Sequence, residues 1–140
     1  MIYYLCMRTY FILYLAALIT IAILDGAWLT IMGKRFYAQY IGHLMAQSPQ
    51  WVPVVLFYLI YIIGVTVLVT MPAIYSGVSI GKVFMLGALL GLAAYGAYDF
   101  TNHATLRDWP TVVTVVDLLW GMVVTGMTSA VAVVITRAIG

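Results

Sequence analysis

Four long apolar segments, separated by short polar stretches, dominate the pattern of the chain. They cover about residues 10–32, 52–71, 80–103 and 110–137. Each is long enough to cross the hydrocarbon core of a bilayer, which takes about 20 residues of α-helix. The pattern therefore predicts an all-α integral membrane protein, a bundle of four transmembrane helices that forms a single domain over residues 1–140.

Individual residues mark the expected ends of these segments. Pro72 is expected to end the second segment, and Ser79 to cap the third. The first segment is expected to be a retained helix rather than a signal peptide, because it is long, contains Asp25 and is not followed by a small-residue cleavage motif. Four crossings would place both termini on the same side of the membrane.

The longest connection, residues 33–51, follows the first segment. Its aromatic and apolar side chains recur at helical spacing between polar residues, at Phe36, Tyr37, Tyr40, Ile41 and Leu44. This spacing predicts a short helix that lies in the plane of the membrane interface. A loop anchored at the interface by its aromatic side chains fits the same residues equally well.

Composition supports a membrane protein and excludes other classes. Of the 140 residues, 66% are hydrophobic and 7% are charged, which is unlike any water-soluble domain. The net charge of +2 is too small and too dispersed for nucleic-acid binding. Cys6 is the only cysteine, so the chain holds no internal disulfide and no cysteine-based metal cluster.

Three of the four acidic residues, Asp25, Asp99 and Asp117, interrupt the apolar segments. A charged side chain inside a bilayer costs about 3 kcal/mol or more, so it marks either a functional site or a buried polar network. Because successive segments run in opposite directions, all three aspartates fall in the half of the bilayer beside the first and third connections. The pattern therefore predicts a bundle with a polar cup at one end.

The three aspartates, with Asp99 first, are the candidate catalytic groups, each as an acid, a base or a proton-relay carboxyl. The structural alternative is a hydrogen bond from an indole, since Asp25 and Asp117 each precede a tryptophan by three residues. The candidate substrate-binding residues share the depth of the cup or surround its rim: Arg107, Asn102, Tyr98, Tyr58, Tyr61, Trp28, Trp120, Lys34 and Arg35. Arg107, with Lys34 or Arg35, would hold an anionic group.

Metal and cofactor chemistry has little support. His103 follows Asp99 by four residues, a spacing that permits joint metal ligation, and His43 could join them. A single D-x-x-x-H is a weak signal, and the chain has no G-x-S-x-G, no H-E-x-x-H and no phosphate loop. We predict neither a metal ion nor a cofactor.

Small residues predict which segments are neighbours. Gly87 and Gly91 form a G-x-x-x-G in line with Asp99, and Gly121 continues the stripe of Asp117. Small faces let the backbones of two membrane helices approach closely. The third and fourth segments are therefore expected to pack together.

The stretches YDFTNHATLRDWP (98–110) and DLLWG (117–121) resemble a family of small bacterial inner-membrane proteins of unknown function, and LDGAWL, FYAQYIGHLM and FYLIYIIG fit the same pattern. The resemblance implies a four-helix protein of the bacterial inner membrane. It also implies similarity to proteins often encoded near, or fused to, lipid-modifying enzymes such as cyclopropane fatty-acid synthases. The matched motif positions are Asp25, Trp28, Tyr98, Asp99, Thr101, Asn102, Arg107, Trp109, Pro110, Asp117 and Trp120. His103 departs from the family pattern, where an apolar or aromatic residue is usual.

Three functions are consistent with this pattern, and none of them identifies a reaction. The first is a lipid-pathway protein whose cup binds a polar or anionic group of a membrane lipid, with a lipid-modifying enzyme as partner. The second is a small proton-coupled transporter that acts as a homodimer. The third is a structural or assembly subunit of a membrane enzyme.

The charges that flank the first segment bear on orientation. Lys34 and Arg35 lie on one side, against Arg8 and the terminal amine on the other, and this balance favours cytoplasmic first and third connections and termini outside.

Overall fold

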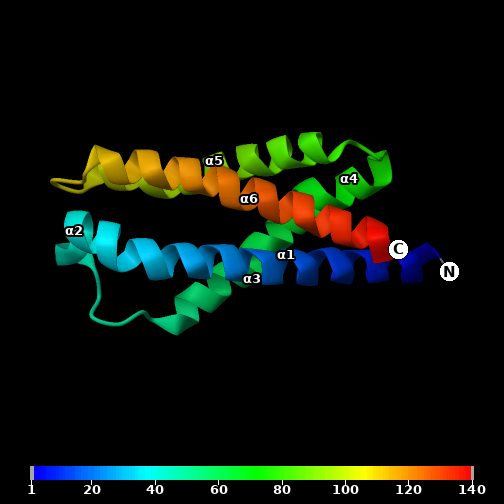
Figure 1. Ribbon diagram of the computed structural model, residues 1–140, viewed down its shortest axis with the longest axis horizontal. Coiled ribbons are helices and arrows are strands. Elements are labelled where there is room, and N and C mark those ends of the chain that lie inside the picture. The colour runs from blue at the N-terminus through cyan, green and yellow to red at the C-terminus, as the bar shows by residue number, and fades with distance from the viewer. Residues whose placement is uncertain (1, 140) are drawn as a thin grey trace.

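The computed structural model describes residues 2–139 as four long helical spans and contains no β-strand in that range (Figure 1). The first span is α1 (Ile2–Met32), which is continued by η1 (Gly33–Tyr37), α2 (Ala38–Ile41) and η2 (Gly42–Leu44). The second span consists of α3 (Trp51–Val65), η3 (Thr66–Thr70) and α4 (Met71–Ser76). The third span is α5 (Ile80–Thr105), and the fourth is α6 (Thr111–Ile139). All four are long and apolar enough to cross a membrane. The predicted all-α, four-span membrane fold is confirmed.

The second span extends further than the sequence predicts. We expected Pro72 to end it, and this was wrong, because the helix continues through the π-helical turn η3 into α4. Proline is tolerated in the first turn of a helical segment, and the change from π to α bonding at Met71 creates such a turn. The span ends at Gly77, whose φ of +62° lies in the left-handed region that favours glycine.

One other local prediction agrees with the structure. The Ser79 hydroxyl accepts a hydrogen bond from the backbone N–H of Lys82 at 3.3 Å, so it caps α5 as expected. Of the connection after α1, residues 33–44 are helical and continue α1 through the π-helical turn η1, whereas residues 45–50 are not helical. The first helical unit therefore extends without a break to Leu44. A position of this helix in the plane of the membrane interface stays a prediction.

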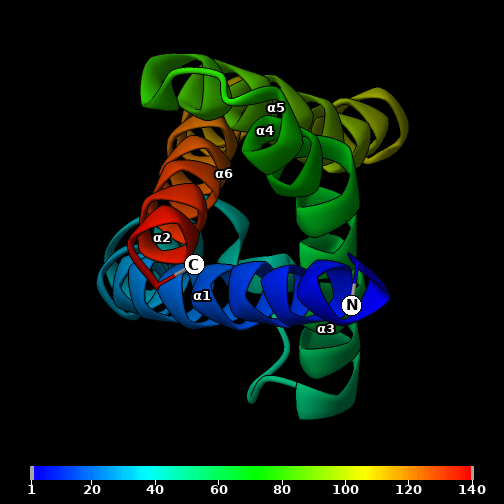
Figure 2. The ribbon, with the colours of Figure 1, turned by 90° about the vertical axis from the view of Figure 1, so that its right-hand side faces the viewer.

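The helices α5 and α6 form an antiparallel hairpin, and α1 lies against α6 (Figures 1 and 2). The second span crosses this layer obliquely. Its η3 segment contacts α5, whereas α3 lies against α1 and leads away from α5 (Figure 2). The bundle is therefore close-packed at the end where α1 begins and α6 ends, and wider at the end that carries the first and third connections.

Glycines allow the close approach of α5 and α6. A Cβ added at Gly91 would lie 2.0 Å from the carbonyl oxygen of Gly121, and one added at Gly87 would lie 2.8 Å from the carbonyl oxygen of Thr125. On the other helix, a Cβ at Gly121 would lie 2.4 Å from Cγ of Tyr95. The predicted contact between the third and fourth segments is therefore confirmed, and it relies on residues without a side chain.

The close-packed end of the bundle holds an apolar core. Leu13, Ile21, Ile62, Val124 and Val133 are fully buried there. Threonine and serine hydroxyls are buried among the helices as well, and those that bond do so mainly to the carbonyl four residues earlier in their own helix.

We expect Gly91→Ala to destabilise the fold by about 1–3 kcal/mol, because the new methyl group would overlap the backbone of Gly121. Gly64→Ala is the matched control, since nothing lies within 4 Å of a Cβ at Gly64 in α3. That change should be neutral or stabilise by about 0.5–1 kcal/mol. Reversible unfolding in bicelles would measure both, and a Gly91→Ala variant as stable as wild type would contradict the close approach.

Candidate functional site

A pocket of about 520 Å³ occupies the wide end of the bundle, and all three buried aspartates contribute to its wall. The rest of the wall is mainly apolar and aromatic. Every span supplies at least one aromatic residue to it: Trp28, Tyr37, Phe57, Tyr95, Tyr98, Trp109 and Trp120. The predicted cup therefore corresponds to a cavity in which Asp25, Asp99 and Asp117 lie together.

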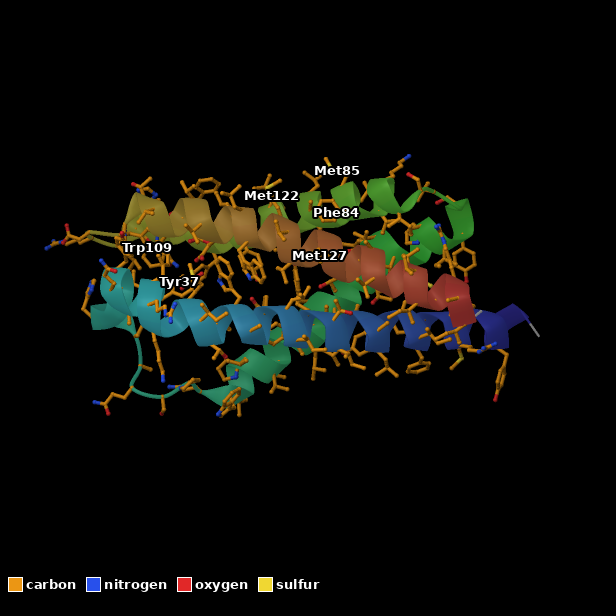
Figure 3. The ribbon with its side chains drawn as sticks, viewed as in Figure 1. Tyr37, Phe84, Met85, Trp109, Met122 and Met127 are labelled. Atoms are coloured by element: carbon orange, nitrogen blue, oxygen red, sulfur yellow. The ribbon has the colours of Figure 1, made fainter. Side chains whose placement is uncertain are left out.

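The segment after α1 forms one wall of this pocket. The residues that line the pocket from this part of the chain are four positions apart: Gly33, Tyr37, Ile41, Met45 and Pro49. The first three share one face of the helical segment. Figure 3 shows Tyr37 and Trp109 at this end of the bundle, between the segment and the α5–α6 hairpin. The segment is thus part of the site, a role that the sequence analysis did not assign to it.

Both carboxyl oxygens of Asp25, in α1, accept a hydrogen bond. Its Oδ1 accepts from the indole N–H of Trp120 at 2.7 Å, and its Oδ2 accepts from the hydroxyl of Tyr58. These donors come from α6 and α3. One carboxyl group therefore links the first span to the second and the fourth through hydrogen bonds.

Asp117 of α6 is bonded in a related way. Its Oδ1 accepts from the hydroxyl of Tyr37, which in turn accepts from the indole N–H of Trp28 at 3.1 Å. The Trp28 and Trp120 rings stack, with centroids 4.2 Å apart and planes 6° from parallel. Because α1 and α6 are antiparallel, their two D-x-x-W sequences face each other. We refer to the connected side chains as the aspartate–tryptophan network: Asp25, Trp28, Tyr37, Tyr58, Asp117 and Trp120.

Asp99 of α5 differs from the other two aspartates. Its side chain is fully buried, and neither carboxyl oxygen has a hydrogen-bond partner among the described residues. Burying a carboxylate without partners costs several kcal/mol. A ligand group that donates hydrogen bonds to Asp99 would therefore recover part of this cost when it enters the pocket.

The other tyrosine and asparagine candidates have different surroundings. Tyr98 lines the pocket, as expected of a ligand-contacting residue. The hydroxyl of Tyr61 lies 2.7 Å from Oγ1 of Thr125, deeper in the bundle, and Tyr61 is not part of the pocket wall. Asn102 is half-buried and does not line the pocket.

The cationic candidates lie outside the pocket. Lys34 and Arg35 line a separate hollow with Thr30 and Ile31, and Arg107 is exposed. Among the residues described, the pocket wall contains three carboxyl groups and no Lys, Arg or His. The structure therefore does not bring together the aspartates and the basic residues that we expected to share an anionic ligand.

The histidines are also separate from the carboxyl groups. Nδ1 of His103 lies 3.4 Å from Oγ1 of Thr114, which accepts a hydrogen bond from the indole of Trp109 at 3.1 Å. His43 is exposed in η2. Over residues 2–139, no group of three or more His, Cys, Asp or Glu side chains is arranged to hold a metal ion.

Of the aromatic residues in the wall, sequence reasoning named Trp28, Tyr98 and Trp120 as candidates, and it missed the part played by Tyr37. We interpreted Tyr37 as one of several aromatic residues at the membrane interface, yet it bonds Asp117 and lines the pocket. The available signal was the interval of four between Gly33, Tyr37 and Ile41, which places these residues on one face of a helix.

Comparison with known proteins gives one family. The model of a family described as "Predicted membrane protein (DUF2177)" matches residues 10–134, a range that includes all of α3 and α5 and nearly all of α6. No curated protein and no solved structure matches the chain.

We expect Tyr37→Phe to destabilise the protein by about 1–2 kcal/mol, because it leaves Asp117 and the Trp28 indole without their shared partner. Tyr40→Phe is the control, since it removes the same hydroxyl from an exposed position in the same segment. Equilibrium unfolding in bicelles would compare them. Equal stability of the two variants would show that the network does not hold the segment.

Proposed function

The chain belongs to the family of predicted membrane proteins designated DUF2177, and from this premise we propose that it binds a membrane amphiphile, with the polar group of the amphiphile inside the pocket. The pocket carries this proposal. A cavity of this size, with a mainly apolar wall and a few convergent polar groups, is typical of small-molecule sites. An amphiphile matches such a wall because one part of it is polar and the remainder is apolar.

The arrangement of α3 and α5 supports entry from the bilayer. Phe57 of α3 and Tyr98 of α5 both line the pocket, and both are exposed at the protein surface. The helices that carry them lie apart at this end of the bundle (Figure 2). We therefore expect the apolar chain of the ligand to leave the pocket between α3 and α5.

The wall also bears on the kind of polar group that would bind. Lys34, Arg35 and Arg107, which we expected to hold an anionic group, are not part of it. Carboxylate oxygens only accept hydrogen bonds. The wall thus favours a polar group that donates hydrogen bonds over an anionic group.

A lipid-pathway role follows from this proposal if the amphiphile is a membrane lipid. A protein that takes a lipid from the bilayer into a polar cavity fits a partnership with a lipid-modifying enzyme, as the sequence resemblance implies. The inner-membrane location and the cytoplasmic first and third connections belong to the same proposal. The location is a prediction from the sequence resemblance, and the orientation is a prediction from the charges that flank the first span.

A structural role is the second candidate, and the aspartate–tryptophan network favours it for two of the three aspartates. Asp25 and Asp117 receive donors from the protein itself, so they can serve packing without any ligand. Asp99 has no such partner in the part of the chain that the structure describes. A purely structural account would leave the third carboxyl group unexplained, which is why we place ligand binding first.

We expect Ala94→Trp to reduce lipid binding by at least about tenfold, a loss of about 1.4 kcal/mol, because the indole would fill part of the pocket that Ala94 lines. Ala93→Trp is the matched control, since Ala93 is exposed on the same helix and is not part of the wall. Photocrosslinking with diazirine-labelled lipids, followed by mapping of labelled peptides, would measure binding. Undiminished labelling of pocket peptides in Ala94→Trp would contradict the proposal.

A further inference from the structure

We propose that the polar group recognised by the pocket is a protonated primary amine, and that Asp99 is the residue that anchors it. This inference rests on the proposed function and specifies the chemical class of the ligand, an amphiphile with a primary ammonium group. Three features of the pocket carry it, namely the unpartnered carboxyl group, the absence of a compensating cation in the wall, and the aromatic surroundings.

The first feature is the demand of Asp99 for donors. Both of its oxygens are buried and have no hydrogen-bond partner among the described residues, and Asp99 is one of the residues that line the pocket. A primary ammonium group carries three N–H donors and a positive charge, so it can satisfy both oxygens and neutralise the carboxylate. A hydroxyl group offers one donor and no charge, and a quaternary ammonium offers charge without a donor. Of these three groups, only the primary ammonium meets both requirements.

The second feature is the charge of the wall. Asp25 and Asp117 accept hydrogen bonds from side chains of the network, so their remaining demand for donors is smaller than that of Asp99. They still contribute negative potential when ionised. Because the described wall contains no Lys, Arg or His, no basic side chain in it neutralises this negative potential, which therefore attracts an incoming cation.

The third feature is the set of aromatic rings that the ligand would meet. Tyr95 precedes Asp99 by one helical turn on α5, and both line the pocket. Tyr98 and Trp109 line it as well, and their rings meet edge to face with centroids 6.2 Å apart. The hydrogen bond to Thr114 fixes the Trp109 ring. Aromatic faces attract ammonium groups, most strongly where water is excluded.

The same head chemistry could come from two sources, an aminophospholipid of the bilayer or a single-chain alkylamine. Both place a primary ammonium at the polar end of an apolar chain. Asp99 would bind the ammonium group of either molecule. A direct test therefore measures binding of the single-chain amine first and then its competition by the phospholipid.

The test uses the full chain in phosphatidylcholine nanodiscs, with Trp51→Phe to remove an exposed tryptophan that does not line the pocket. The other three tryptophans line the pocket and report binding by fluorescence. The ligands are dodecylamine, dodecyltrimethylammonium, dodecanol and dodecyl phosphate. We expect saturable binding of dodecylamine that is at least about tenfold tighter than that of the other three, because its hydrogen bonds to Asp99 are charge-assisted.

Asp99→Asn tests the anchor. It should remove the preference for dodecylamine, whereas Asp108→Asn, in an exposed loop position, should keep it. Asp99→Asn breaks no hydrogen bond between described side chains, so we expect the variant to fold. The ranking of the four ligands on the unmodified pocket needs no variant at this position, and it tests the inference by itself.

The outcomes separate this inference from the proposed function. If dodecanol binds as tightly as dodecylamine, and Ala94→Phe, which fills part of the pocket without adding a tryptophan, abolishes both, the pocket binds amphiphiles and the ammonium class is overturned. If no ligand gives a saturable signal that Ala94→Phe removes, the proposed function fails as well. Where dodecylamine is preferred, its displacement in nanodiscs that contain phosphatidylethanolamine identifies an aminophospholipid as ligand, and lack of displacement identifies a single-chain amine.

Discussion

A carboxyl group inside a bilayer needs hydrogen-bond donors from the protein, and this requirement organises the wide end of the bundle. Asp25 takes donors from α6 and α3, and Asp117 takes one from the segment after α1. These bonds link the first, second and fourth spans and draw the segment over the pocket. The cavity is thus enclosed by the same side chains that satisfy two of the three aspartates.

The third aspartate is placed by a different interaction. Glycines let α5 and α6 approach until their backbones touch, which fixes α5 in rotation and depth. Tyr95 packs on Gly121 in this interface, and Asp99 follows it one turn later at the pocket wall. Backbone packing therefore positions Asp99, and no donor among the described residues satisfies it. A rigid, unpartnered acceptor in an apolar cavity is suited to a ligand that supplies donors.

Much of this architecture could be predicted from the sequence, because it depends on hydrophobic length and on the alternation of span direction. Those two properties gave the four spans and the common depth of Asp25, Asp99 and Asp117, and G-x-x-x-G gave the contact between α5 and α6. The partners of each carboxyl group could not be predicted, since they depend on helix tilt and rotation. The hydrogen bond from Tyr37 to Asp117 and the position of Lys34 outside the pocket are examples. The continuation of the second span through Pro72 could not be predicted either, because it depends on the π-helical turn before this proline.

The central claim is that Asp99, rather than Asp25 or Asp117, anchors the ligand. Infrared difference spectra with and without dodecylamine, recorded in the carboxyl region, would test it most directly. The account predicts a ligand-induced band in wild type that is lost in Asp99→Asn and kept in Asp25→Asn, whose site is occupied by Trp120 and Tyr58. A band that persists in Asp99→Asn and disappears in Asp25→Asn would contradict the account.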